Sequence, residues 1–143
     1  MDGVVEFALR QRLRAAEAVS DLAGTVGGEA AIDIGERKSN NVSAFPAVVQ
    51  TVVEPGRIYN QSRRQGTRKG LFRYEVFGLN ADSTLLLAEA IADELEAEPE
   101  ASIAGVRFQR GIIFAGPRNG GVEALGDLTI HRRILDMEIT TKT

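Results

Sequence analysis

The chain has 143 residues, of which 43% are hydrophobic and 26% are charged, and its formal net charge at pH 7 is −3. This length fits one domain with a single core, and the composition excludes a chain that is disordered throughout. The sequence contains no cysteine, which excludes disulfides, thiol catalysis and thiolate metal sites.

The N-terminal stretch MDGVVEFALRQRLR mixes acids and arginines with apolar residues. A signal peptide needs a cationic start followed by an uninterrupted apolar run, and neither is present. The longest apolar stretch, residues 85–92, is interrupted by Glu89 and is too short to span a bilayer. We therefore expect a soluble protein that is made inside the cell and does not contact a membrane.

Residues 4–22 show helical periodicity, and Gly24 provides a stop. One face of this helix is apolar and carries Val5, Ala8, Leu9, Leu13, Ala16 and Val19. Two residues break the pattern, because Arg12 lies within the apolar stripe and Phe7 lies outside it. Arg12 either extends its charged head to water or, together with Phe7, forms a second face that meets a neighbouring subunit.

Residues 27–43 are rich in Gly, Asn and Ser and contain a short β-like piece at 31–34. Two strands follow, at 44–54 with Pro46 at its start and at 71–79, where Phe72, Tyr74 and Val76 alternate with charged residues. Two such strands joined by a polar, glycine-containing segment predict a β-hairpin. Its long tip is NQSRRQGTRKG, residues 60–70.

A second helix is predicted over residues 84–98, capped by Asp82 or Ser83 and ended by Pro99. Its apolar stripe is Leu87, Ala88, Ile91 and Leu95, and its solvent face carries Glu89, Asp93 and Glu96.

The remaining sequence predicts a second hairpin, with strands at 106–115 and 128–140 joined by a GPRNGG turn. The first of these strands places Val106, Phe108, Ile112 and Phe114 on one face. In the second, the apolar phase shifts between Ile130 and Leu135, which indicates a β-bulge or a strand buried on both sides. The predicted fold class is α+β, with an antiparallel or mixed sheet built from two hairpins and two helices packed on one face.

The sequence offers little for catalysis. His131 is the only histidine, which excludes a histidine-based metal cluster. No Ser–His–acid arrangement, nucleophile elbow, phosphate-binding loop or dinucleotide motif is present. We therefore expect a protein that is not an enzyme and has neither a cofactor nor a metal.

Positive charge is concentrated at one place in this acidic chain, in and beside the predicted hairpin tip. The residues are Arg57, Arg63, Arg64, Arg68 and Lys69. A nucleic-acid interface of this size on a monomer would bind weakly and would depend steeply on salt. Tyr59 and Phe72 flank residues 60–70, but no aromatic residue lies within that segment. In a ring of subunits, each copy would contribute the same basic patch to one shared surface, and the total number of phosphate contacts would rise.

The sequence resembles the tail-completion, or tail-terminator, proteins of long-tailed bacteriophages and prophage-derived particles. The resemblance spans nearly the whole chain. It rests on EFALRQRLRAAEAVSDLAG as the opening helix, FPAVVQTVV as the first long strand, LFRYEVFGLNADSTLLLAEAIADELEA as a strand and helix, and IHRRILDMEIT as the closing strand. One departure is IDIGE, which stands where the family usually has an Ile-Tyr pair.

The resemblance implies one mixed α/β domain over residues 1–143 and a non-enzymatic role in the virion, made in the cytoplasm of a bacterial host. Such proteins form a homohexameric ring at the head-proximal end of the tail tube, stop tube polymerisation and offer a surface for head joining. The implied partners are further copies of the chain, the major tail-tube protein and a head-completion or neck protein. DNA passes through the channel without sequence-specific binding.

In such a ring the contacts are heterologous, so the acidic face of the second helix and the basic cluster are candidates for a match between neighbours. The basic cluster could instead face the tube or the lumen. Two other functions remain open, a head-completion or neck adaptor and a small nucleic-acid-binding protein that uses the basic segment.

Overall fold

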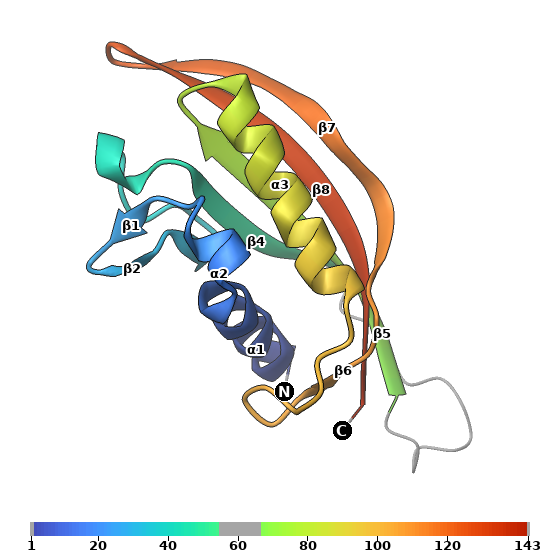
Figure 1. The fold of residues 1–143 in the computed structure, drawn as a ribbon. Helices are drawn as coiled ribbons and strands as arrows, with labels where there is room; N and C mark the ends of the chain where they lie inside the picture. Colours follow the sequence, from blue (N-terminus) through green and yellow to red (C-terminus); the bar gives the residue numbers. More distant parts are fainter. Residues whose placement is uncertain (1, 55–66, 143) are drawn as a thin grey trace.

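The computed structural model describes residues 2–54 and 67–142, and in this part of the chain the predicted α+β class is confirmed (Figure 1). One mixed sheet is built from β3 (Ile32–Ile34), β4 (Ala47–Glu54), β5 (Thr67–Gly78), β8 (Leu128–Lys142), β6 (Arg107–Phe108) and β7 (Ile112–Leu125). The strand order is β3-β4-β5-β8, and both β6 and β7 pair with β8 along its far edge. A separate small hairpin joins β1 (Thr25–Val26) to β2 (Glu29–Ala30).

The helices are α1 (Asp2–Ala15), α2 (Glu17–Ser20) and α3 (Ala81–Glu96), and a 3-10 turn, η1, covers Val42–Ala44. The single helix predicted over residues 4–22 is therefore interrupted, because Ala16 adopts an extended conformation between α1 and α2. Four residues of the predicted apolar stripe are nevertheless buried, and Val5 and Ala16 are half-buried against the same core. Asn80 caps α3 by accepting a hydrogen bond from the Ser83 amide at 2.8 Å, so the predicted cap at Asp82 or Ser83 is wrong.

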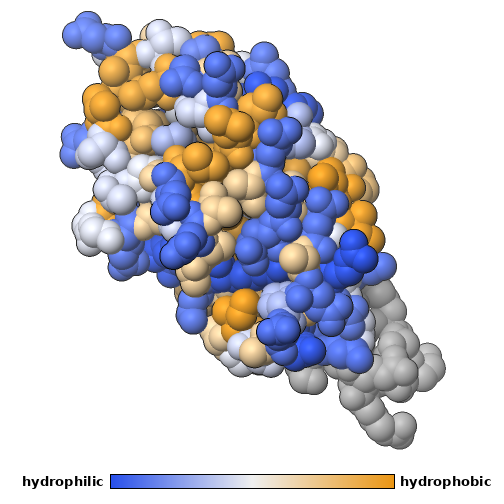
Figure 2. Space-filling view, in the orientation of Figure 1, coloured by the Kyte–Doolittle hydropathy of each residue, from blue (hydrophilic) through white to orange (hydrophobic). Residues whose placement is uncertain are grey.

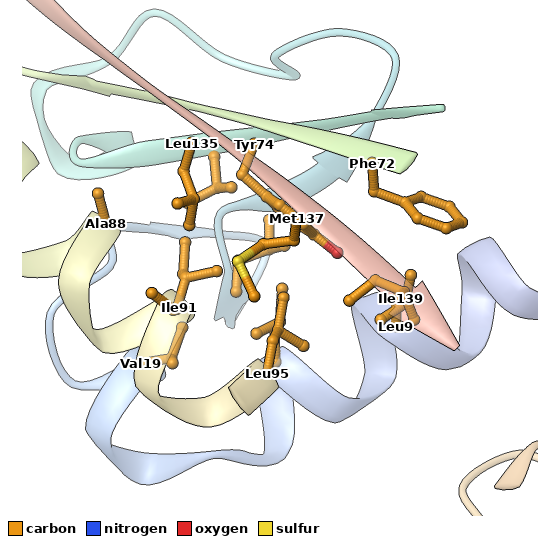
Figure 3. Packing of buried hydrophobic residues seen from close by; sticks show 14 of the residues in the cluster. Leu9, Val19, Phe72, Tyr74, Ala88, Ile91, Leu95, Leu135, Met137 and Ile139 are labelled. Carbon is orange, nitrogen blue, oxygen red and sulfur yellow. The ribbon is translucent and has the colours of Figure 1, made fainter. Parts of the chain in front are cut away.

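The main core lies between the helices and one face of the sheet (Figure 3). Because side chains alternate along a strand, β5 points Phe72, Tyr74 and Val76 toward the helices and points Arg73 and Glu75 the other way. The helices contribute their stripes to the same cluster, namely Leu9, Leu13, Val19, Leu87, Ile91 and Leu95. The helices lie on one face of the sheet, as predicted. Within the described residues the opposite face, here called the open face, has no helical layer.

Strand β8 lies inside the sheet, between β5 on one side and β6 and β7 on the other, and explains the apolar phase shift seen in the sequence. Its pairing with β5 runs from Thr67↔Lys142 to Gly78↔His131 without a register shift. Residues 134–137 are buried on both faces of the strand. Of the two predicted explanations, burial on both sides is the one found at this point, and the bulges lie in β7 instead.

The second hairpin differs from its prediction. GPRNGG is not the turn, because β7 runs through it to Leu125 and the chain reverses at Gly126 and Asp127. Register shifts on both sides of this segment accommodate its glycines and proline. At Gly116 a Cβ atom would lie 2.3 Å from the Ile134 carbonyl oxygen, so only glycine allows this close approach.

The apolar face predicted for residues 106–115 is also wrong. Val106 and Phe108 are buried, whereas Ile112 and Phe114 are 58% and 66% exposed. The reason is that residues 106–115 do not form one strand. The chain leaves β6, the Gly111 amide donates a hydrogen bond to the Leu95 carbonyl at 2.7 Å, and β7 starts afterwards with a different orientation.

Candidate assembly surfaces

Arg12 lies inside the protomer, and the prediction that its head reaches water is wrong. The residue is only 3% exposed. Its Nε donates to the Glu94 carboxylate at 2.9 Å, and its Nη2 donates to the carbonyl oxygens of Glu94 and Ala97 at the end of α3. The guanidinium also lies over the Phe108 ring, 5.3 Å from its centroid. Arg12 therefore joins α1 to the C-terminus of α3 within one chain and is not available to a neighbour.

Phe7, the other candidate on the first helix, lies on the outer surface of α1. Its side chain is 57% exposed, and the Arg10 guanidinium lies over its ring, 5.5 Å from the centroid. Val4, one helical turn earlier, is 48% exposed. The outward side of α1 thus combines two apolar side chains with a cation, and we call these three residues the α1 outer patch.

The acidic face of α3 points to solvent as predicted. Glu89 and Asp93 are exposed and Glu96 is half-buried. Among the described residues, these three carboxylates form no ion pair. Acids near a helix C-terminus are unfavourable to the helix dipole, and two arginines offset this by bonding the terminal carbonyls. One is Arg12, and the other is Arg110, whose Nε donates to the Glu96 carbonyl at 3.2 Å.

The basic cluster falls mostly outside the described residues, where Arg57, Arg63 and Arg64 lie. Its last two members are placed, and they belong to a strand and not to the predicted hairpin tip, because β5 starts at Thr67. Arg68 pairs with Thr141 across the ladder to β8. Lys69 is an exposed residue, and its Nζ lies 3.8 Å from the Glu138 carboxylate on the open face.

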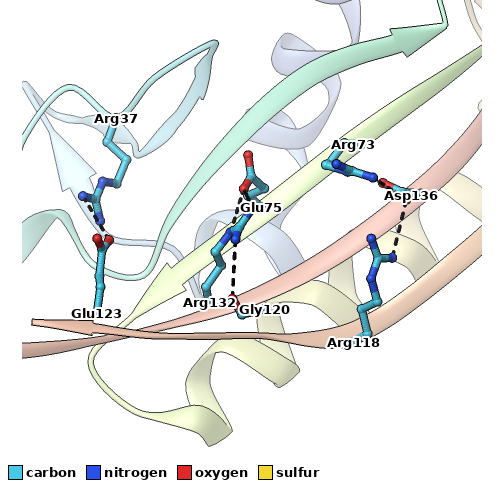
Figure 4. A network of polar contacts seen from close by, with 8 residues as sticks. All are labelled: Arg37, Arg73, Glu75, Arg118, Gly120, Glu123, Arg132 and Asp136. Carbon is cyan, nitrogen blue, oxygen red and sulfur yellow. Dashed lines mark hydrogen bonds and ion pairs between the residues drawn. The ribbon is translucent and has the colours of Figure 1, made fainter.

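A network of ion pairs covers the open face and was not predicted (Figure 4). Arg73 makes two hydrogen bonds to the Asp136 carboxylate, at 2.9 and 3.2 Å, and Arg118 approaches the same carboxylate at 3.5 Å. Arg132 pairs with Glu75. The alternation of the strands indicates which side chains share a face, but it does not give the pairing register that brings residues 73 and 136 together.

These contacts perturb two ionisable groups. Burial disfavours the charged form of Asp136, but the hydrogen bond and charge of Arg73, together with Arg118, outweigh it and lower its pKa. The hydrogen bond from Arg73 to Asp136 raises the pKa of Arg73. The pair is therefore ionised at neutral pH and acts as a structural link between β5 and β8.

A cleft of about 370 Å³ opens on the same face between β5, β8 and β7. Its lining combines apolar residues, Phe77, Val122 and Ile130, with the Glu75–Arg132 pair. Each charged group of that pair already has a partner. The third charged residue of the lining, Glu123, lies 3.6 Å from the Arg37 guanidinium, so the described lining offers no acid–base group without a charged partner. Among the described residues, no three His, Asp or Glu side chains gather as a metal site.

Exposed apolar residues gather along β7, the outer strand of the sheet. Ile112, Ile113 and Phe114 are consecutive and all exposed, and we call them the β7 apolar strip. The space-filling view shows apolar surface along this edge of the molecule (Figure 2). The sequence signal, IIFA, is visible, but the alternation expected of a half-buried strand assigned two of these side chains to the core.

None of the helices in the described parts of the chain combines the length and apolar character needed to cross a bilayer.

No protein-family model matches the chain, and no curated protein sequence is significantly similar to it. Solved structures share its fold. A chain from the virion of a native gene transfer agent particle gives a TM-score of 0.63 at 16% sequence identity, over 99% of this chain and 96% of that chain. Another solved protein gives 0.51 at 14% identity, over 97% and 95%. This protein therefore has, over nearly its whole length, the fold of a chain found in a virion-like particle.

Proposed function

We propose that this protein is a structural component of a phage or phage-derived particle and that it acts there as a tail terminator. The observation that carries the proposal is the fold likeness to the gene transfer agent chain, which extends over almost the full length of both chains. The resemblance of its sequence pattern to tail-terminator proteins supports the more specific role.

In this role the protein has no catalytic function. It forms a ring, taken to be a homohexamer, on the head-proximal end of the tail tube, prevents the addition of further tube subunits and provides the surface for head joining. A ring made by heterologous contacts needs two different complementary surfaces on each protomer. Exposed apolar side chains on α1 and β7 and the unpaired acids of α3 are consistent with such surfaces.

The test is to mix purified protein with tubes of its cognate major tail protein and to image them by negative-stain electron microscopy. We expect a ring-shaped cap at one end of each tube and shorter tubes when the protein is present during polymerisation. A protein that leaves tube length unchanged and never decorates a tube end is not a terminator.

A neck adaptor would leave the tubes in this assay bare. It would instead bind the portal end of DNA-filled heads when these are supplied. The genes on either side provide an independent check, since a major tail-tube gene immediately downstream favours the terminator.

A further inference from the structure

We infer that the subunits of the proposed ring meet through two particular surfaces. The α1 outer patch of one copy, Val4, Phe7 and Arg10, docks on the β7 apolar strip and the adjoining acids of α3 in the next copy. The inference rests on the proposed ring and adds which faces meet.

The two surfaces lie on different sides of the protomer. Helix α1 packs beside β3 and β4, whereas β7 is at the other edge of the sheet (Figure 1). A head-to-tail contact requires this arrangement, because each copy must offer one surface forward and another backward.

Their apolar contents match. The α1 outer patch exposes Phe7 and Val4, and the β7 apolar strip exposes Phe114 and Ile112, with between 48% and 66% of each residue open to solvent. Clustered exposed apolar side chains are characteristic of interaction sites, and aromatic residues in particular act as anchors.

Their charges also match. The cation beside Phe7 is Arg10, and within the described residues it has no ion-pair partner. The start of β7 lies against the C-terminal turn of α3, since the Gly111 amide bonds the Leu95 carbonyl. The exposed carboxylates of Asp93 and Glu89 belong to α3, the helix that contacts β7. In the docked pair, the cation carried with Phe7 would approach a part of the next copy whose helix α3 carries these acids.

The alternative use of β7 is pairing of its backbone edge with the β7 of a second copy about a two-fold axis. The structure disfavours this, because register shifts interrupt β7 at residues 113–115, 115–118 and 119–122. Bulges of this kind disrupt an edge ladder and block strand addition. Bulges do not block contact through side chains, so the proposed docking uses the exposed side chains of β7 and not its backbone.

The absence of cysteine in the chain allows a direct test. One population carries Val4→Cys, a second carries Ile112→Cys on a larger affinity tag, and the two are mixed and treated with a short bis-maleimide. We expect the mixed cross-link to be the main product and each variant alone to give little. Dominant self-cross-linking of Ile112→Cys, or no mixed product at high protein concentration, would overturn the inference.

Substitutions in the same background test the anchors. Phe7→Ala or Phe114→Ala should abolish most of the mixed cross-link, while Val42→Ala, which alters an equally exposed apolar residue on η1, should not. Arg10→Glu should reduce the yield about fivefold, and adding Asp93→Arg should restore it.

If tubes are capped but this cross-link fails, the surfaces are wrong and the function stands. If the cross-link forms and tubes remain uncapped, the function is wrong and the contact stands.

Discussion

Tyr74 places a hydroxyl group in the middle of the apolar core. The residue is completely buried, and among the described residues its hydroxyl oxygen has no hydrogen-bond partner. Burial raises the pKa of Tyr74, because the charged phenolate is disfavoured in the apolar core. Burying a hydroxyl group without a hydrogen-bond partner destabilises the folded state. A phenylalanine ring at the same place would avoid this cost.

The first prediction follows from this. Tyr74→Phe should raise the free energy of unfolding by about 1 kcal/mol, measured by urea denaturation. The matched control is Thr84→Val, which removes a buried hydroxyl that does donate, to the Ala81 carbonyl at 2.7 Å, and should destabilise. A clear loss of stability in Tyr74→Phe would show that the hydroxyl is hydrogen-bonded.

Asp136 gives a prediction about pH. Because its pKa is lower in the folded protein than in the unfolded chain, its ionisation stabilises the fold above the unfolded value of about 4, and this contribution is lost as pH falls through the folded pKa. Asp136→Asn should therefore be less stable than wild type at pH 7, and the difference should shrink toward pH 3. Urea denaturation at several pH values measures it. A difference that does not depend on pH would mean that the carboxylate charge is not what stabilises the pair.

At the scale of elements, the decisive contact is the one between α1 and the end of α3. Arg12 alone bonds the Glu94 side chain and two terminal carbonyls, and its side chain is nearly inaccessible to solvent. Without it, these acceptors would lose their partner in a partly buried place.

We expect Arg12→Ala to lower the free energy of unfolding by about 3 kcal/mol, in the range found for breaking a buried ion pair. Arg12→Lys should lose part of this, because one ammonium group cannot reproduce the fork of the guanidinium. Thermal unfolding followed by circular dichroism measures both, with Arg10→Ala as the surface control. Equal stability of Arg12→Ala and Arg10→Ala would contradict the proposed linkage.

The sequence predicted those elements whose signal is local. The apolar stripes of the helices and the alternation of β5 follow from helical and strand periodicity. The predicted residues of α3 and the inward-facing residues of β5 are buried as expected, and those of the first helix are buried apart from Val5 and Ala16, which are half-buried. The hairpin of β4 and β5 follows from two apolar runs joined by a polar segment, and their antiparallel pairing is confirmed.

The failures come from partners far away in the sequence. GPRNGG has the composition of a turn, but pairing with β8 keeps it in a strand and its glycines become bulges. The partner of Arg12 is 82 residues away and that of Arg73 is 63 residues away. Nothing in the local pattern distinguishes an arginine that reaches water from one that meets such a partner.

At the scale of the whole molecule, the role of the basic cluster in assembly is still a prediction. Changing Arg63, Arg64, Arg68 and Lys69 to alanine should impair ring assembly or head joining and leave the fold of the protomer intact. Lys69 is consistent with this, since its pairing with Glu138 is long and exposed and contributes little stability. Tube capping and head–tail joining measure the loss, and circular dichroism checks the fold. Variants that cap and join normally would make the cluster an ordinary solvated surface.

The unbroken ladder between β5 and β8 has a consequence for the order in which the protein opens. Backbone amides in the middle of a continuous, centrally placed ladder exchange with solvent only when the whole domain unfolds, whereas an interrupted outer strand opens alone. In deuterium exchange, amides of residues 72–77 should be the slowest and those of β7 much faster. When subunits assemble, protection should increase along β7 and α1 and change little in the ladder, which would record ring formation in solution, amide by amide.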